Sequence, residues 1–153
     1  MSTTDVSIIE ESAQKTRRWL DELAEELGRP GDQRYALRVL RGFLHTLRDR
    51  LPVPETAALG AQLPEFLRGV FYEGWRPSAT PQRYHDLDTF LARVATDARL
   101  AGETEAAYSV EAAARVLRRH IGDGELAHVS AVLPRPLAAM LNGSTKGGID
   151  DHA

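Results

Sequence analysis

The chain repeats itself, because residues 36–71 align with residues 106–141 at a constant offset of 70 and without a gap. Nine aligned positions are identical, and a Leu-Pro-x-x-Leu motif that starts at residue 63 returns at residue 133. Between the identities, apolar residues replace apolar residues, as Leu40 and Val110 do. Shared helical periodicity would not readily give this many matches, so we interpret the pattern as an internal duplication.

The pattern of apolar residues indicates helices throughout. Apolar side chains recur three and four positions apart in segments that glycine and proline separate. A capping box at Ser7 predicts the start of the first helix, which turns Ile9 inward and ends at Gly28. Asp32 is the predicted cap of the second helix, and a short fourth helix over residues 65–73 is predicted to carry Phe66. No segment alternates with a period of two, so strands are not expected.

We therefore predict an all-α fold, a tandem repeat of two four-helix units packed as one pseudo-twofold helical bundle. One domain is expected over residues 1–153. Its parts are repeat one at 7–74, a linker at 75–85 and repeat two at 86–143. Residues 144–153 are polar and glycine-rich, and are predicted to be a disordered tail.

The composition excludes several classes of protein. The chain has no cysteine, which excludes disulfides, thiol nucleophiles and thiolate metal sites, and favours the cytoplasm. No apolar run approaches the roughly 18 residues of a membrane span, and the first residues do not resemble a signal peptide. We expect a soluble cytoplasmic protein with no membrane partner.

A basic stripe follows one face of the second predicted helix. Its residues are four, three, four and three positions apart, so at about 100° per residue they share one narrow arc. We call this set the ridge: Arg34, Arg38, Arg41, His45 and Arg48. Guanidinium groups bind carboxylates and phosphates through paired hydrogen bonds, so the ridge is a candidate binding surface.

The ridge also has a structural interpretation, which is the more common one for such stripes. Acidic residues of the preceding helix form a plausible counter-surface: Glu10, Glu11, Asp21, Glu22, Glu25 and Glu26. The repeat helps to weigh the two interpretations. The corresponding positions of the second half are Thr104, Tyr108, Glu111, Arg115 and Arg118. Only the end of the ridge recurs, which favours a function for the first copy.

The linker supplies a second candidate site. Trp75 and Arg76 follow Gly74 and precede Pro77, and tryptophan and arginine are typical of the energetic centres of protein interfaces. The alternative is that Trp75 folds back over the seam between the repeats as a lid. Trp19 lies beside Leu20 on the first helix and is expected in the core.

Signals for metal binding and catalysis are weak. His45 and Asp49 are four residues apart, and Tyr84-His85-Asp86 with Asp88 gathers further donors, but neither set has the spacing of a metal site. The sequence contains no nucleophile elbow, phosphate-binding loop or dinucleotide fingerprint. We predict no enzymatic activity, no cofactor and no metal, and expect Asp86 or Asp88 to cap a helix.

Two motifs carry a resemblance to a known family. Leu-Arg-Asp-Arg-Leu-Pro stands at residues 47–52, and Gln-Leu-Pro-x-x-Leu-Arg-Gly-x-Phe-Tyr-x-Gly-Trp-x-Pro at residues 62–77. With Gly124-Glu125 and Leu133-Pro134 of the second half, they resemble the bacterial family known as domain of unknown function 2267. The resemblance implies a small helical bacterial protein built from repeats, and it implies no catalytic residues.

Three functions remain open. The first is a non-enzymatic interaction module that offers the ridge, Trp75 and Arg76 to an acidic protein partner, or that forms a homo-oligomer. The second is a nucleic-acid-binding protein that uses the ridge, which the net charge of −3 makes less favourable. The third is a small-molecule-binding bundle with a cavity between the repeats, where Ala112, Ala113 and Ala114 would face Gly42, Phe43 and Leu44.

Overall fold

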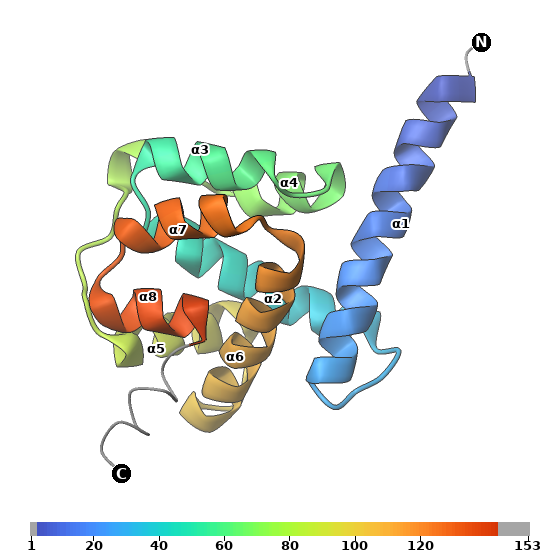
Figure 1. Cartoon of the computed structure of the whole chain (residues 1–153). Coiled ribbons are helices and arrows are strands. Elements are labelled where there is room, and N and C mark those ends of the chain that lie inside the picture. Colours follow the sequence, from blue (N-terminus) through green and yellow to red (C-terminus); the bar gives the residue numbers. More distant parts are fainter. Residues whose placement is uncertain (1–2, 144–153) are drawn as a thin grey trace.

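The structure, a computed structural model, describes residues 3–143, and these form eight α-helices, one short 3-10 helix and no strand (Figure 1). The all-α prediction is confirmed. In chain order the helices are α1 (Thr3–Glu26), α2 (Gln33–Asp49), α3 (Val53–Ala61), α4 (Glu65–Tyr72), the 3-10 helix η1 (Pro77–Ala79), α5 (Leu87–Ala98), α6 (Glu103–His120), α7 (Asp123–Ala131) and α8 (Arg135–Asn142). The predicted disordered tail, residues 144–153, lies outside the described residues.

Local side-chain chemistry sets several helix ends where the sequence predicts them. The Asp32 carboxylate accepts a hydrogen bond from the backbone N–H of Tyr35 at 3.1 Å and caps α2. Asp86 caps α5 through the N–H of Thr89 at 2.9 Å. Gly28 follows the end of α1 with a φ of +74°, a left-handed conformation that glycine adopts at little cost.

The local structure of the two halves matches at the offset of 70. The bounds of α3 and α7 differ by 70 residues, and so do those of α4 and α8. Pro52 and Gly122, which precede α3 and α7, have the same extended backbone, with φ/ψ of −62°/159° and −63°/149°. The repeated sequence therefore folds into repeated local structure even where proline is exchanged for glycine.

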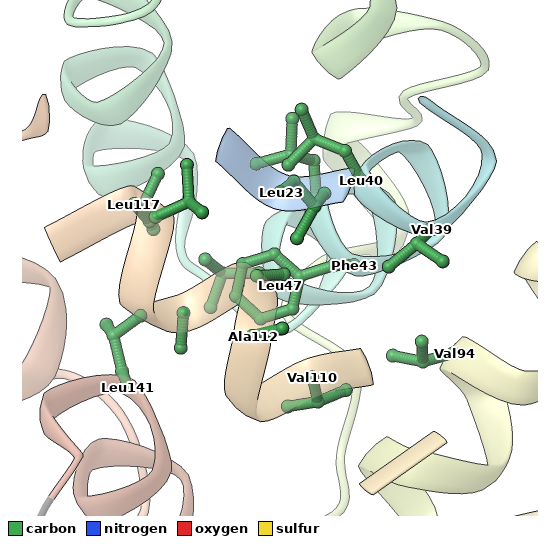
Figure 2. Close-up of a cluster of buried hydrophobic side chains, with 14 of the residues drawn as sticks. Leu23, Val39, Leu40, Phe43, Leu47, Val94, Val110, Ala112, Leu117 and Leu141 are labelled. Atoms are coloured by element: carbon green, nitrogen blue, oxygen red, sulfur yellow. The ribbon is translucent and has the colours of Figure 1, made fainter. Parts of the chain in front are cut away.

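The core is built around α2. This helix contacts α1, α4, α5 and α6, and its apolar side chains meet those of its neighbours in one cluster (Figure 2). Phe43 and Leu47 of α2, Leu23 of α1, Val94 of α5 and Leu117 of α6 are fully buried. Burial of apolar area of this kind is the main source of folding free energy.

The predicted start of α1 and the predicted inward position of Ile9 are wrong, and both concern the projecting half of α1. The helix begins at Thr3 rather than at Ser7, and its N-terminal half extends beyond the other helices (Figure 1). Ile9 was expected inward but is 69% exposed, and Phe66 of α4 is 52% exposed. Apolar periodicity continues along α1, but the helices against which these residues would pack end before the helix does.

Charged residues occur along both of the longest helices. α1 has 24 residues and α6 has 18, which are lengths that could span a bilayer if the sequences were apolar. Within residues 3–143, no helix is both long enough and apolar enough to cross a membrane.

A close contact between α2 and α5, at Gly42 and Ala98, provides a test of the packing. A Cβ added at Gly42 would lie 2.9 Å from the Cβ of Ala98 and 3.0 Å from its backbone N. Gly42→Ala should therefore lower the free energy of unfolding by about 1–2 kcal/mol, because overpacking outweighs the helix propensity of alanine. Urea titration of both proteins measures the difference.

Gly69 of α4 is the matched control, since nothing lies within 4 Å of a Cβ added there. Gly69→Ala should raise the free energy of unfolding by about 0.5–1 kcal/mol. Changes of the same sign in both variants would contradict the packing of α2 on α5.

Candidate functional site

The structure places all five ridge residues on α2, but it gives them unequal surroundings. Arg34 is exposed, Arg38, Arg41 and His45 are half-buried, and Arg48 is only 4% exposed. The ridge is therefore not a uniform solvated surface. Its C-terminal half lies against α4 and α5, whereas its N-terminal half faces outward.

Arg48 caps the C-terminal end of α4. Its Nη1 donates hydrogen bonds to the backbone oxygens of Phe71 at 2.8 Å and Glu73 at 2.6 Å, and its Nε donates to Asp49 at 2.8 Å. The last carbonyls of a helix have no partner within the helix, so a buried arginine satisfies groups that otherwise lack one. At the offset of 70, Arg118 donates to the backbone oxygen of Leu141 at 2.9 Å. The same cap occurs in both halves, which identifies Arg48 as a structural residue.

His45 also contacts neighbouring helices. Its Nε2 lies 2.7 Å from the backbone oxygen of Val70, and because a carbonyl only accepts, this nitrogen carries a proton. Its Nδ1 lies 3.8 Å from the carboxylate of Asp97 on α5. The corresponding residue, Arg115, pairs with Glu26 of α1 at 2.7 Å. In both halves, therefore, this position links the long helix to an acidic residue on the first helix of the other half, α5 for His45 and α1 for Arg115.

Arg41 connects the ridge to the linker. Its Nε donates to the carboxylate of Glu73 at 3.1 Å, and both side chains are about half exposed, at 42% and 53%. Exposed pairs of this kind contribute little to stability and exchange partners readily. Glu73 stands two residues before Trp75, so the structure brings the middle of the ridge next to the start of the linker.

Within residues 3–143, Arg34 and Arg38 form no ion pair. The Arg38 guanidinium lies 5.2 Å from the ring centre of Tyr35, and its Nε has no hydrogen-bond partner. Arg29, which the sequence analysis missed, lies 3.7 Å from the same ring. Its position directly before the Pro-Gly turn that leads into α2 is the only signal that could have identified it.

Tyr35 is held in place by Glu105 of α6. Its hydroxyl donates to Oε2 of Glu105 at 2.5 Å. Burial, followed by this hydrogen bond, raises the pKa of Tyr35, and the hydrogen bond from Tyr35 is the main reason that the pKa of Glu105 is lowered. The tyrosine is therefore a neutral, fixed aromatic surface beside Arg29 and Arg38.

Trp75 folds back onto the end of α4. Its ring centre lies 5.1 Å from that of Tyr72 at an angle of 40°, and the side chain is half-buried. The indole Nε1 has no hydrogen-bond partner among the described residues. Arg76 is exposed. The linker thus carries a half-buried aromatic side chain and an exposed cation next to each other.

The predicted counter-surface of the ridge is wrong for Glu22 and Glu26. Both pair with α6 instead: Glu26 with Arg115 at 2.7 Å and with Arg119, and Glu22 with Arg119 at 3.4 Å and His120 at 2.9 Å. The reason is that this acidic side of α1 lies against α6 and not against the ridge face of α2. Glu22 and Glu26 therefore do not pair with the ridge and instead join α1 to α6.

Trp19 takes part in the same contact between α1 and α6. It is 3% exposed, as expected for a core residue, and stacks on His120 with ring centres 4.6 Å apart. His120 is half-buried in this contact. Its ring is held between the indole and the carboxylate of Glu22.

The candidate metal ligands do not assemble. In residues 3–143, no group of three or more histidines and carboxylates is arranged so that it could hold a metal ion. Asp86 serves as a helix cap, as predicted. Burial raises the pKa of Tyr84 to about 12, which makes it a poor anionic ligand.

The segments predicted to line a cavity between the repeats are packed. Gly42, Phe43, Leu44 and all three alanines from Ala112 to Ala114 are buried. The hollows that the structure shows lie at the surface and are lined elsewhere. One of about 570 Å³ lies between α2, the linker and α5, near Tyr84.

Arg48 and Arg34 provide a test of the division within the ridge. Arg48→Met removes the cap of α4 from a buried site and should lower the free energy of unfolding by about 2–4 kcal/mol. Arg34→Met changes an exposed residue of the same helix and should alter it by less than about 0.5 kcal/mol. Equal effects in urea titrations would show that the ridge is not divided.

The pairs between α1 and α6 predict a pH dependence. The hydrogen bond from Arg119 is the largest cause that lowers the pKa of Glu26 from its usual 4.5. A lowered pKa in the folded state stabilises the fold above pH 4.5, and this contribution is lost as the pH falls through the lowered pKa.

Glu26→Gln should therefore be less stable than the wild type at neutral pH, and the difference should narrow below pH 4.5. Urea titrations across this range measure it. Glu25→Gln is the control, because Glu25 is exposed and forms no ion pair in the described part of the chain. A difference for Glu26→Gln that did not change with pH would contradict the assignment.

One family matches the chain. A family model described as "Uncharacterized conserved protein (DUF2267)" matches residues 16–140. The matched region contains the whole ridge and the linker, and it begins after the projecting half of α1. No curated protein matches the chain.

Proposed function

Because the chain belongs to the family described as uncharacterized conserved protein (DUF2267), a description that states no activity, we propose a function from the geometry of the ridge. The protein is a non-enzymatic helical binding module. It presents the outer half of the ridge, Arg34, Arg38 and Arg41, together with Trp75 and Arg76, to an acidic protein partner.

One observation carries this proposal. The ridge positions that are basic in both halves, 45 and 48, are the ones that the fold uses to fasten α4 and to pair with a neighbouring helix. The remaining positions, 34, 38 and 41, are basic only in the first half. In the described residues their arginines form no buried hydrogen bond or ion pair, even though the Nε of Arg38 is itself buried, so interactions within the fold do not explain why these positions are basic.

The chemistry of the outer ridge suits carboxylates. Arg34 and Arg38 are one helical turn apart, so their side chains can reach a single acidic segment. The ring of Tyr35 lies beside Arg38 and limits its movement, which lowers the entropic cost of binding. Trp75 and Arg76 add the aromatic and cationic chemistry that is frequent at the centres of interfaces.

Nucleic acid is the alternative ligand for the same surface. Phosphates would bind the same guanidinium groups, and the affinity would then fall steeply with salt. The net charge of −3 is unfavourable for a broad nucleic-acid interface. A small-molecule site between the repeats is the third possibility, and no contact described above favours it.

Two further proposals concern the chain as a whole. We propose that it consists of two copies of a four-helix unit related by a pseudo-twofold axis. The equal offsets of α3 and α7, of α4 and α8, and of the arginine caps support this proposal. We also propose a bacterial cytoplasmic protein, because the absence of cysteine suits a reducing compartment.

A labelled glutamate-rich peptide tests the function. Fluorescence anisotropy should show binding by the wild type. Arg34→Glu with Arg38→Glu should weaken it at least about tenfold, because two attractive charges become repulsive. Arg83→Glu with Arg135→Glu makes the same change in net charge at two exposed residues elsewhere, and should change the affinity less than about threefold.

A duplex DNA of similar charge distinguishes the alternative. Tighter binding to DNA than to the peptide, with a steep dependence on salt, would favour nucleic acid. Equal losses in the two double variants would show that net charge alone governs binding. No binding of the peptide by the wild type would contradict the proposal.

A further inference from the structure

The projecting half of α1 carries an exposed apolar surface that the proposed function does not use. Ile8 and Ile9 are 50% and 69% exposed, and Phe66 of α4, at 52%, lies beside the same helix. Large apolar side chains gathered at one place on a surface are typical of a docking site.

These residues line a groove between α1, α2 and α4. The groove has a volume of about 570 Å³ and includes Ala13 of α1 and Leu37 of α2. Its two hydroxyl groups form hydrogen bonds within the chain: Ser12 Oγ accepts from the N–H of Phe66 at 3.1 Å, and Thr16 Oγ1 donates to the backbone oxygen of Ser12 at 2.8 Å. An apolar partner could therefore cover this face while each hydroxyl oxygen keeps one hydrogen bond.

We propose that a second copy of this chain docks in the groove, with the two α1 helices antiparallel about a twofold axis near Ala13. In such a dimer the same surface serves both partners, so it must be complementary to itself. The groove meets this condition in shape, because Ala13 has a small side chain at the point where the two helices cross. It also meets the condition in charge.

One flank of the groove shows the charge complementarity. At about 100° per residue, Glu10 and Arg17 lie on the same flank of α1 next to Ala13, and both are exposed. In an antiparallel pair each flank meets the same flank of the partner, so Glu10 faces Arg17 of the second copy. In a parallel pair this flank would meet the opposite flank of the partner, and the two charges would not face each other. The charges therefore favour the antiparallel arrangement.

The helix itself needs a partner. The segment from Thr3 to Ile9 contains five β-branched residues, which are weak helix formers. Helical segments shorter than about 12–15 residues are marginal in water unless tertiary packing supports them, and the projecting part of α1 is such a segment. A second copy in the groove supplies packing that the rest of the chain does not.

The other occupants are less complementary. The last ten residues, 144–153, contain a single large apolar residue, Ile149. A lipid surface would favour a basic polar face, whereas Glu10 and Glu11 balance Lys15 and Arg17 along this helix.

Light scattering on the full chain, between about 5 and 200 μM, tests the dimer. The wild type should approach twice the monomer mass of 16.9 kDa at the upper concentrations. Ile9→Glu with Phe66→Glu should raise the dissociation constant at least about tenfold, since both exposed side chains would place charges in the interface. Circular dichroism should show that the variant remains folded.

The matched control is Val132→Glu, which charges an apolar side chain that is 36% exposed but lies on the other half of the chain. It should leave the dissociation constant unchanged within about twofold. A monomeric wild type at every concentration would overturn the proposal, and so would a dimer that the groove variant leaves intact. Binding of the monomer to lipid vesicles would identify a different occupant.

Single cysteines determine the orientation, because the chain has none of its own. Ala13→Cys should form an intermolecular disulfide on oxidation, since the two copies of residue 13 meet near the axis. Ile9→Cys should not, because its two copies would lie roughly 12 Å apart along the helix, beyond the reach of a disulfide. Crosslinking at residue 9 in a variant that still dimerises would contradict the antiparallel pair.

Discussion

The burial of α2 is the constraint on which the rest of the structure depends. Four other helices pack around it, and its apolar arc is buried except at Leu37, which borders the groove. When a helix is enclosed to this degree, its neighbours also contact part of the polar arc that adjoins the apolar one. Where α4 and α5 come close, at His45 and Arg48, the basic side chains become part of the fold. Where those helices end, the arginines face outward. The division of the ridge is thus a consequence of packing rather than of any difference in chemistry among its members.

Much of the fold was predictable because its signals are local. The caps at Asp32 and Asp86 and the glycine that follows α1 depend on neighbouring residues, so the sequence contains the information. The exposed positions of Ile9 and Phe66 were not predictable in this way. Periodicity shows which face of a helix is apolar, but it does not show where the neighbouring helix ends.

The candidate site was predictable in composition but not in role. Sequence spacing placed five basic residues on one face of α2 and could not show that Arg48 would meet the end of α4. The repeat nevertheless contained a clue, because Arg48 recurs as Arg118 and both residues cap the same helix end. A basic residue that survives in both halves is explained by the fold that both halves share. The assignment of Glu22 and Glu26 failed for the converse reason, since the choice between α2 and α6 as their partner depends on tertiary packing alone.

The surface of α2 can now be divided into three strips. Ala36, Leu40 and Leu47 point into the core, and Gln33 and Leu37 border the groove beside α1. The third strip contains Arg34, Arg38 and Arg41, and the groove strip lies between it and the core strip. The groove and the outer ridge occupy neighbouring strips of the same helix. A second copy that docks in the groove would therefore fix the position of Arg34 and Arg38 relative to that copy and leave both side chains uncovered. A dimer would then present two outer ridges at a fixed distance and orientation. An acidic partner with two matching segments would bind both ridges, and its affinity would rise because the first contact increases the effective concentration of the second segment.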